Sequence, residues 1–364
     1  MKGVFWASLG ALAWTHAGYP ATAALAARLG ARPVRRRDAL PSVTVIVAAW
    51  NEEAVIERRV QNLLALDYPA ELVDIIVASD ASTDRTDELV EVMAAAEPRV
   101  RLLRCPRGGK VAAQNRAVRE ARGEVVAFSD ANSTWELRAL RLLVRSFADD
   151  DVAYVCGKVV LQTDEGRNKE GVYWRYELLV RQSESELGSI TGGNGAIYAL
   201  RRSDYVDVDA RFGHDLALPY LLARSGRRAV YDHEALAFEK ATPTTEDEYR
   251  RKVRMFEHCW AIVAEGRMLR GQQPLYALEL VSHRHLRYAS GALHVALLGS
   301  SVLLLRSGKV YRATFAGQAG LLAAATRVGL ARYYVLVTWA TLEALANYVR
   351  RGVPAVWEQA EGTR

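Results

Sequence analysis

The stretch VTVIVAAWNEE, residues 43–53, decides the fold of this 364-residue chain. Its first residues are mostly β-branched and apolar, as in a buried strand. The polar turn that follows contains Trp50, Asn51, Glu52 and Glu53. Asn51 is a favoured N-cap, and acidic residues stabilise the first turn of a helix. The stretch therefore predicts a strand that passes directly into a helix.

The same alternation continues along the chain. We expect further strands at 73–77, 99–103 and 124–128, and helices at 83–96 and 111–122. Strands and helices that alternate at this spacing predict an α/β fold with a mostly parallel, doubly wound sheet. Ligands of such sheets bind beyond the carboxyl ends of the strands.

Both ends of the chain are more apolar than its middle. Residues 3–29 are rich in Gly, Ala, Leu and Trp, and basic residues follow at 32–37. A cleaved signal carries its charges before the apolar run, so this order favours a retained transmembrane helix with its carboxyl side in the cytoplasm. Three apolar segments, 288–305, 313–330 and 333–349, predict further membrane helices, with buried soluble helices as the alternative.

These patterns divide the chain into three regions. They are an amino-terminal span with its basic flank (1–40), an α/β domain (41–265), and interfacial and transmembrane helices (266–364). We expect a multi-pass protein of the inner membrane, in contact with lipid, whose α/β domain faces the cytoplasm. The modest net charge of +6 suits a membrane surface or a phosphate-bearing ligand. A nucleic-acid partner is not expected, because the sequence has no long basic face interleaved with aromatic residues and no nucleic-acid motif. Three widely spaced cysteines favour neither disulfides nor a zinc site.

Candidate site residues follow three of the predicted strands. Asp80 comes after the second strand, either as a capping group or as an acceptor for a nucleobase or ribose. Gly108-Gly109-Lys110 opens a helix, where backbone and ammonium groups favour an anion such as a diphosphate. Asp130 and Asn132 end the fourth strand, and their oxygens suit one hard cation, Mg²⁺ or Mn²⁺.

Two later segments are also candidates. The glycine-dense loop around Gly193 and Asn194 is either a tight turn or a surface against which a sugar ring packs. Asp215 lies at the first turn of a helix, as a cap or as a general base. The basic run 250–254, which includes Arg251 and Arg254, is either solvated, or faces anionic lipid headgroups, or holds a pyrophosphate.

Taken in order, these motifs resemble those of family 2 glycosyltransferases with a GT-A fold, in the membrane-embedded branch related to processive polysaccharide synthases. Residues 47–52 resemble the opening strand motif, and 80–84 the Asp-Gly-Ser-Thr-Asp segment. Residues 109–115 resemble the diphosphate motif that ends in Asn115, 130–132 the metal-binding Asp-x-Asp, and 213–215 the motif that ends in the catalytic base. The resemblance implies Asp215 as base and Asp130 and Asn132 as metal ligands. The expected substrate-binding residues are Trp50, Glu52, Asp80, Lys110, Asn115, Gly193, Asn194, Arg251 and Arg254.

The chain departs from this family pattern at three points. Asn132 replaces the second metal aspartate, and His214 replaces the glutamate before the base. The Gln-x-x-Arg-Trp signature of processive synthases reads Arg251-Lys252-Val253-Arg254-Met255, without the glutamine and the tryptophan. The missing tryptophan favours transfer of one or a few sugars over long-chain polymerisation.

The expected function is inverting, hexosyltransferase-type transfer from a nucleotide-diphosphate sugar to a lipid-linked or glycan acceptor at the membrane. One alternative is a catalytically weak pseudo-glycosyltransferase that binds nucleotide sugar as a membrane scaffold. A sugar-1-phosphate nucleotidyltransferase fits less well, because its basic, glycine-rich loop would stand where residues 50–53 are found.

Overall fold

A computed structural model describes residues 1–162, 171–241 and 244–356 of the chain. Eight strands form one sheet in the order β3-β2-β1-β4-β7-β6-β8-β5. The strands are β1 (Val43–Ala49), β2 (Val73–Asp80), β3 (Val100–Cys105), β4 (Val125–Asp130), β5 (Thr134–Trp135), β6 (Val152–Gln162), β7 (Tyr198–Arg201) and β8 (Arg228–Lys240).

The sheet is parallel in one half and mixed in the other. Strands β3, β2, β1 and β4 are parallel, as the sequence predicts. Beyond them β7 runs antiparallel to both β4 and β6, and β5 runs antiparallel to β8. The prediction of a mostly parallel sheet is therefore wrong for this half. Strands and helices still alternate after Asp130, with α7 between β6 and β7, but β7 is a short strand that returns antiparallel between β4 and β6.

The parallel half is buried on both faces. Val45 and Val47 of β1 belong to the core on one face, and Ile46 between them belongs to the core on the other. Successive strand residues point to opposite faces, so a strand covered on both sides reads as a continuous apolar run. This explains why the 43–49 stretch carries no polar alternation.

The helix after β1 begins later than the sequence predicts. It is α3 (Ile56–Leu64), so Asn51 is not its N-cap. Asn51 instead has φ +56°, and its side-chain oxygen accepts a hydrogen bond of 2.7 Å from the Thr83 N–H. Asparagine tolerates the left-handed region better than most residues do. The Asn51 side chain thus joins the loop after β1 to the loop after β2.

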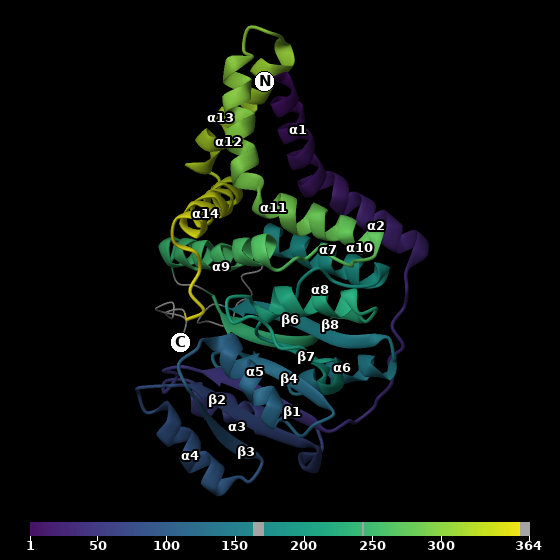
Figure 1. The fold of residues 1–364 in the computed structure, drawn as a ribbon, viewed down its shortest axis with the longest axis vertical. Coiled ribbons are helices and arrows are strands. Elements are labelled where there is room, and N and C mark those ends of the chain that lie inside the picture. The colour runs from purple at the N-terminus through teal and green to yellow at the C-terminus, as the bar shows by residue number, and fades with distance from the viewer. Residues whose placement is uncertain (163–170, 242–243, 357–364) are drawn as a thin grey trace.

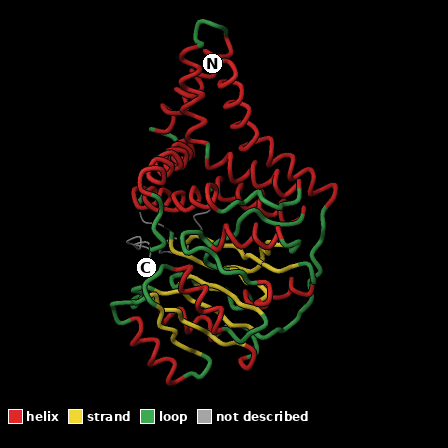
Figure 2. Tube along the Cα trace, in the orientation of Figure 1, coloured by secondary structure: helices red, strands yellow, loops and turns green. Residues whose placement is uncertain are grey.

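Some of the remaining helices cover the sheet, and the others form a tapering helical end beyond it (Figures 1 and 2). Those of the α/β region are α4 (Thr86–Ala96), α5 (Lys110–Glu120), α6 (Ala139–Val144), α7 (Val172–Leu187), α8 (His214–Arg224) and α9 (Thr245–Glu265). The helical end comprises α1 (Lys2–Ala13), α2 (Tyr19–Gly30), α10 (Pro274–Glu279), α11 (Leu286–Tyr288), α12 (Ser290–Leu303), α13 (Lys309–Ala325) and α14 (Gly329–Arg351).

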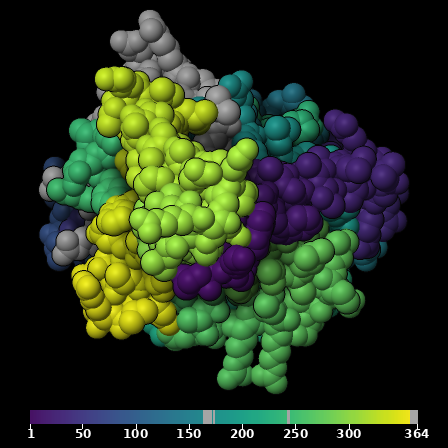
Figure 3. All heavy atoms as spheres, turned by 90° about the horizontal axis from the view of Figure 1, so that it is seen from above, coloured from purple at the N-terminus to yellow at the C-terminus, as the bar shows by residue number. Residues whose placement is uncertain are grey.

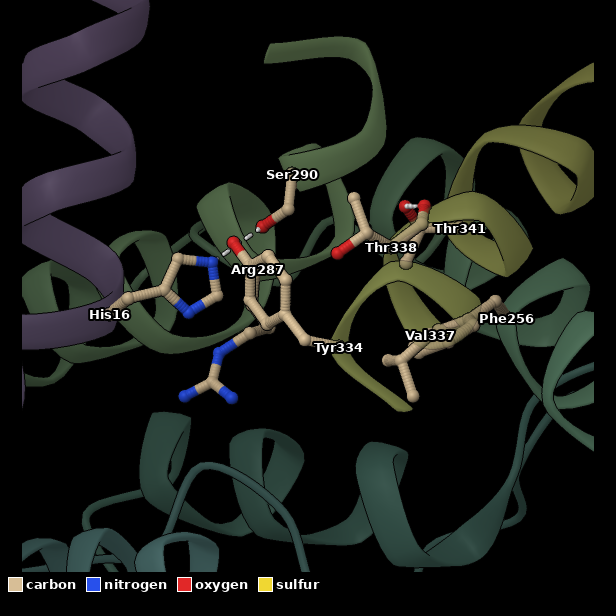
Figure 4. Close-up of a pocket in the computed structure, with 8 residues that line it drawn as sticks. All are labelled: His16, Phe256, Arg287, Ser290, Tyr334, Val337, Thr338 and Thr341. Carbon is tan, nitrogen blue, oxygen red and sulfur yellow. Dashed lines mark hydrogen bonds between the residues drawn. The ribbon is translucent and has the colours of Figure 1, made fainter. Parts of the chain in front are cut away.

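Helices from the first and last parts of the sequence share this helical end. Helix α1 packs on α12, α2 on α7, and α14 on α9, and Figure 3 shows the purple amino-terminal helices beside the yellow-green helices of the carboxyl-terminal region from above. Where they meet, His16 and Ser290 are hydrogen-bonded at 3.2 Å beside Tyr334 (Figure 4). Among the described residues no single helix has the length and apolar character to cross a bilayer. The pair α13 and α14 meets both criteria only together, with a bend of 108° between them.

Candidate active site

The parallel strands bring the predicted donor-side residues to one edge of the sheet. Asp130 ends β4 level with Ala48 of β1, and Asp80 ends β2 one position beyond the Ala49–Ser79 pair. Since carboxyl ends of parallel strands meet at one edge, both aspartates lie where a ligand of this fold would bind. We call this edge, with the 107–110 turn, the donor edge.

Asp80 holds the 107–110 turn in place. Its buried carboxylate accepts hydrogen bonds from the Gly108 and Gly109 N–H groups, at 2.7 and 2.9 Å, and from Arg107 at 2.5 Å. The Arg107 guanidinium lies over the Trp50 ring, 3.7 Å from its centroid. Arg107 thus covers one face of the ring of Trp50, an expected substrate-binding residue.

Gly109 is required at this turn for two reasons. Its φ of +89° lies in the region that favours glycine. A Cβ atom there would also lie 2.1 Å from the Ala355 carbonyl oxygen. The chain beyond α14 therefore returns to the donor edge (Figure 1), a contact between distant segments that no local sequence pattern indicates.

Lys110 and Asp130 form an ion pair in the centre of the donor edge. Burial lowers the pKa of Lys110, but the Asp130 carboxylate more than offsets this, with help from Asp215 and Glu239, and the pKa is raised. Lys110 is therefore a fixed ammonium group. Gly195 completes this part of the site, because a Cβ atom there would lie 3.0 Å from the Lys110 Nζ.

The oxygen groups of Asp130 and Asn132 fit a divalent cation. Carboxylate and amide oxygens are hard donors, and the ammonium of Lys110 already takes the place of a cation against Asp130. No cluster of three His, Cys, Asp or Glu side chains suited to a metal occurs within the described ranges. A cation here would therefore depend on Asp130, Asn132 and oxygens of the ligand.

Asp215 lies in the first turn of α8, close to Lys110. It is one of the charges that raise the pKa of Lys110, and its backbone carbonyl accepts a hydrogen bond of 2.6 Å from the Gly193 N–H. His214 before it points into the core, with Nδ1 2.9 Å from the Tyr198 hydroxyl. Burial, with Lys110, lowers the pKa of His214 to about 3, so the imidazole is neutral and adds no positive charge beside Asp215.

The glycine loop (residues 191–196) connects Asp215 to the donor edge. Gly193 contacts Asp215, and Gly195 lies against Lys110 and Asp130. Between them the Asn194 side chain bonds to the Gly157 carbonyl at 2.7 Å and to the N–H groups of residues 196 and 197. Asn194 thus shapes the loop, whose glycines contact Asp215 on one side and Lys110 on the other.

The other predicted binding residues lie around this centre. The Asn115 side chain bonds to Tyr205 and Val208. Glu52 is buried, and its N–H donates to the Thr86 hydroxyl at 2.7 Å. On α9, Arg251 pairs with Glu248 at 2.9 Å, and burial lowers the pKa of Arg254.

Sequence reasoning missed Glu239, near the end of β8. Burial and the Asp130 carboxylate raise the pKa of Glu239, while Arg251 and Lys110 lower it. The pairing of Thr134 with Phe238 explains this proximity, because it brings the end of β8 beside residues 132–134. A lone glutamate at the end of a strand gives no signal for this in the sequence.

Comparison with known proteins agrees with this geometry. The family described as "Glycosyl transferase family 2" matches residues 44–208, from β1 through the glycine loop. Residues 44–208 thus match a family 2 glycosyltransferase domain. The family match thus spans every strand end of the donor edge, and α8 with Asp215 follows directly after it.

Two curated relatives are synthases. The beta-monoglucosyldiacylglycerol synthase of Synechocystis is 36% identical over 111 residues, which are 30% of this chain and 23% of that protein. The poly-beta-1,6-N-acetyl-D-glucosamine synthase of Staphylococcus aureus is 24% identical over 239 residues, 62% of this chain and 56% of that protein. The chain thus spans between about a quarter and about half of the length of these relatives.

A solved structure matches nearly the whole chain. It is the mannosyltransferase PcManGT of Pyrobaculum calidifontis, in complex with GDP-Man and Mn²⁺. The TM-score is 0.74 at 22% identity, over 95% of this chain and 99% of that one. At this identity the likeness concerns the fold, and the mixed eight-stranded sheet with its helices is consistent with a GT-A fold.

Proposed function

We propose that this protein transfers one or a few sugars, with inversion, from a nucleotide-diphosphate sugar to a membrane-associated acceptor. One observation carries the proposal. The glycine loop contacts the Asp215 backbone at Gly193 and the Lys110–Asp130 pair at Gly195. A candidate base and a candidate diphosphate site thus lie at the two ends of one short stretch of backbone.

The chemistry follows from this arrangement. The Asp215 carboxylate takes the proton of the acceptor hydroxyl as its oxygen bonds to the anomeric carbon and the bond to the diphosphate breaks. Lys110, with Arg254 from α9, stabilises the charge that develops on the leaving diphosphate. Mg²⁺ or Mn²⁺ held by Asp130 and Asn132 would supply further positive charge there.

The acceptor in this proposal is lipid-linked or a surface glycan. The names of two relatives, a glucosyldiacylglycerol synthase and a polysaccharide synthase, support membrane-associated acceptors. The helical end also supports this, because its apolar helices lie on the Asp215 side of the site, away from β1–β3 (Figure 1). We therefore place the protein at the inner membrane with its α/β domain in the cytoplasm.

A donor panel tests the proposal. Purified full-length protein is given UDP- and GDP-linked sugars, with diacylglycerol, glucosyldiacylglycerol or a polyprenyl-linked sugar as acceptor, with Mg²⁺, Mn²⁺ or EDTA. We expect one nucleotide sugar to give nucleoside diphosphate and glycosylated acceptor in equal amounts. Absence of product with every pair, although nucleotide binding is measurable, would favour the pseudo-glycosyltransferase, the alternative that Asn132 and His214 motivate.

A further inference from the structure

The glycine loop begins at Thr191, whose hydroxyl group lies within hydrogen-bond distance of three side chains. A hydroxyl can donate one hydrogen bond and accept two. The Thr191 hydroxyl donates to Glu184 at 2.9 Å, accepts from the Arg284 Nε at 2.9 Å, and lies 3.1 Å from the His283 Nδ1. The start of the loop is thus bonded to residues about a hundred positions later in the chain.

Glu184 of α7 is the centre of this network. Its carboxylate also accepts from the Thr191 N–H at 3.0 Å, from the Tyr19 hydroxyl at 2.8 Å and from His283 at 2.6 Å. Burial alone would raise the pKa of Glu184, but the neighbouring His283 and Arg284 lower it to about 2. This buried, ionised carboxylate therefore links α7 to Tyr19 of α2 and to His283 of the helical end.

The two residues that connect this network to the glycine loop, His283 and Arg284, belong to a π-helical turn, η5 (Leu280–His285). Such turns are uncommon and occur often at functional sites. Here the turn carries His283 to Glu184 and Arg284 to the loop. A Cβ atom on Gly192 would lie 2.7 Å from Arg284 Nη2, so the guanidinium lies directly on the loop backbone.

The next residue of the loop reaches the candidate base. The Gly193 N–H donates to the Asp215 carbonyl at 2.6 Å, and the Gly193 carbonyl accepts from Arg181 of α7 at 3.0 Å. A continuous path therefore runs from η5 through Thr191, Gly192 and Gly193 to Asp215. The loop meets the donor edge two residues later, at Gly195.

We propose that Thr191 and Arg284 are positioning residues that fix the position of Asp215 relative to the helical end. The helices of the helical end and the catalytic base then move as one unit. The inference rests on the proposed function, in which Asp215 is the base. Displacing a catalytic group by about 1 Å can cost about a hundredfold in rate. Loss of the Thr191 hydroxyl should therefore slow turnover while it leaves donor binding intact.

The test compares threonine substitutions at two buried positions in the full-length protein. Thr191→Val removes the hydroxyl, and Thr191→Ser keeps it. Thr341→Val is the matched control, because Thr341 of α14 is similarly buried and its hydroxyl bonds to Gly291 and Thr338 of the helical end. The kcat and the donor KM are measured with UDP-glucose or GDP-mannose, whichever turns over in the donor panel, and nucleoside-diphosphate affinity by calorimetry.

We expect Thr191→Val to lower kcat by about 10- to 100-fold, with donor KM and nucleotide affinity within twofold of wild type. Thr191→Ser should restore at least half of kcat, and Thr341→Val should keep it. Arg284→Lys keeps the charge but loses the Nε bond. It should lower kcat in the same selective way, which provides a second test if Thr191→Val does not fold.

Two results would overturn the inference. One is a folded Thr191→Val or Arg284→Lys protein with kcat within twofold of wild type. The other is a loss shared equally by kcat and nucleotide affinity, or one that serine does not restore, since that indicates general damage. Asp215→Asn distinguishes failure of this inference from failure of the proposed function. If Asp215→Asn is inactive and Thr191→Val is fully active, only the positioning role fails. If Asp215→Asn is active, the base assignment itself fails.

Discussion

The donor edge and the helix-side network differ in how the chain assembles them. At the donor edge each candidate residue belongs to the end of its own strand or the start of the next helix, as with Asp80, Lys110 and Asp130. The helix-side network joins Tyr19, Glu184 and His283, which come from three separate helical segments. The donor edge is therefore local in sequence and the network is not, although both converge on the glycine loop.

This difference indicates a division of labour. Parallel strands fix the donor edge directly, because register alone places Asp130 level with Ala48. Asp215 is fixed less directly, through a loop whose position depends on contacts with distant helices. Variants at the donor edge should thus change ligand or metal affinity, and variants on the Asp215 side should change rate or stability.

The largest expected effect is at Asp215, where the two regions meet. Asp215→Asn keeps the shape of the side chain but removes the base, and general-base catalysis contributes about 10²- to 10⁴-fold. We expect kcat to fall by about that factor while nucleotide affinity stays within twofold. Asp207→Asn is the control, since Asp207 forms an exposed ion pair with Arg119. Substantial turnover by Asp215→Asn would place the base elsewhere.

A second effect concerns stability on the Asp215 side. His214 is neutral in the folded protein because burial lowers its pKa to about 3, whereas the unfolded chain binds a proton near pH 6.5. The unfolded state therefore binds more protons between these values, and the free energy of unfolding falls as pH drops below 6.5. The slope approaches about 1.4 kcal/mol per pH unit.

Denaturant unfolding between pH 7.5 and 5 measures this slope. In His214→Gln the part of the slope due to this residue should vanish, even if the variant is less stable at every pH. His233→Gln, at an exposed position of β8, should leave the slope unchanged. Equal slopes in the wild type and in His214→Gln would contradict a neutral, buried imidazole.

A smaller effect is expected at the donor edge. Asn132→Asp adds a second carboxylate beside Asp130, and ligand charge strengthens divalent-cation sites, here by about tenfold. Titration of Mn²⁺ with electron paramagnetic resonance detection of the free ion measures this without turnover. Asp130→Asn should abolish measurable binding, both alone and when combined with Asn132→Asp. Unchanged Mn²⁺ affinity in Asn132→Asp would mean that position 132 does not face the cation.

The same division separates the features that the sequence predicts from those that it does not. The strands from 43 to 130 and the donor-edge residues are readable, because apolar runs and the polar residues that end them are local signals. The mixed half of the sheet is not, since the antiparallel pairing of β7 with β4 and β6 depends on where a loop returns the chain. The Arg284 contact with the glycine loop and the return of Ala355 to Gly109 are equally invisible, because nothing local encodes them.

The smallest expected effect concerns the backbone that follows β2, beside the donor edge. Ala81 has φ +57° at the end of β2, a conformation that costs an L-residue about 1–2 kcal/mol and glycine almost nothing. The extra freedom of glycine in the unfolded chain offsets part of this gain, so Ala81→Gly should raise the free energy of unfolding by about 0.5–1 kcal/mol. Ala78→Gly, in the interior of the same strand and fully buried, should instead lower it by about 1 kcal/mol or more. Because Ala81 borders the turn before α4 and contributes no charge, nucleotide affinity should stay unchanged in Ala81→Gly. Destabilisation by both glycines would show that the left-handed conformation at Ala81 carries no strain.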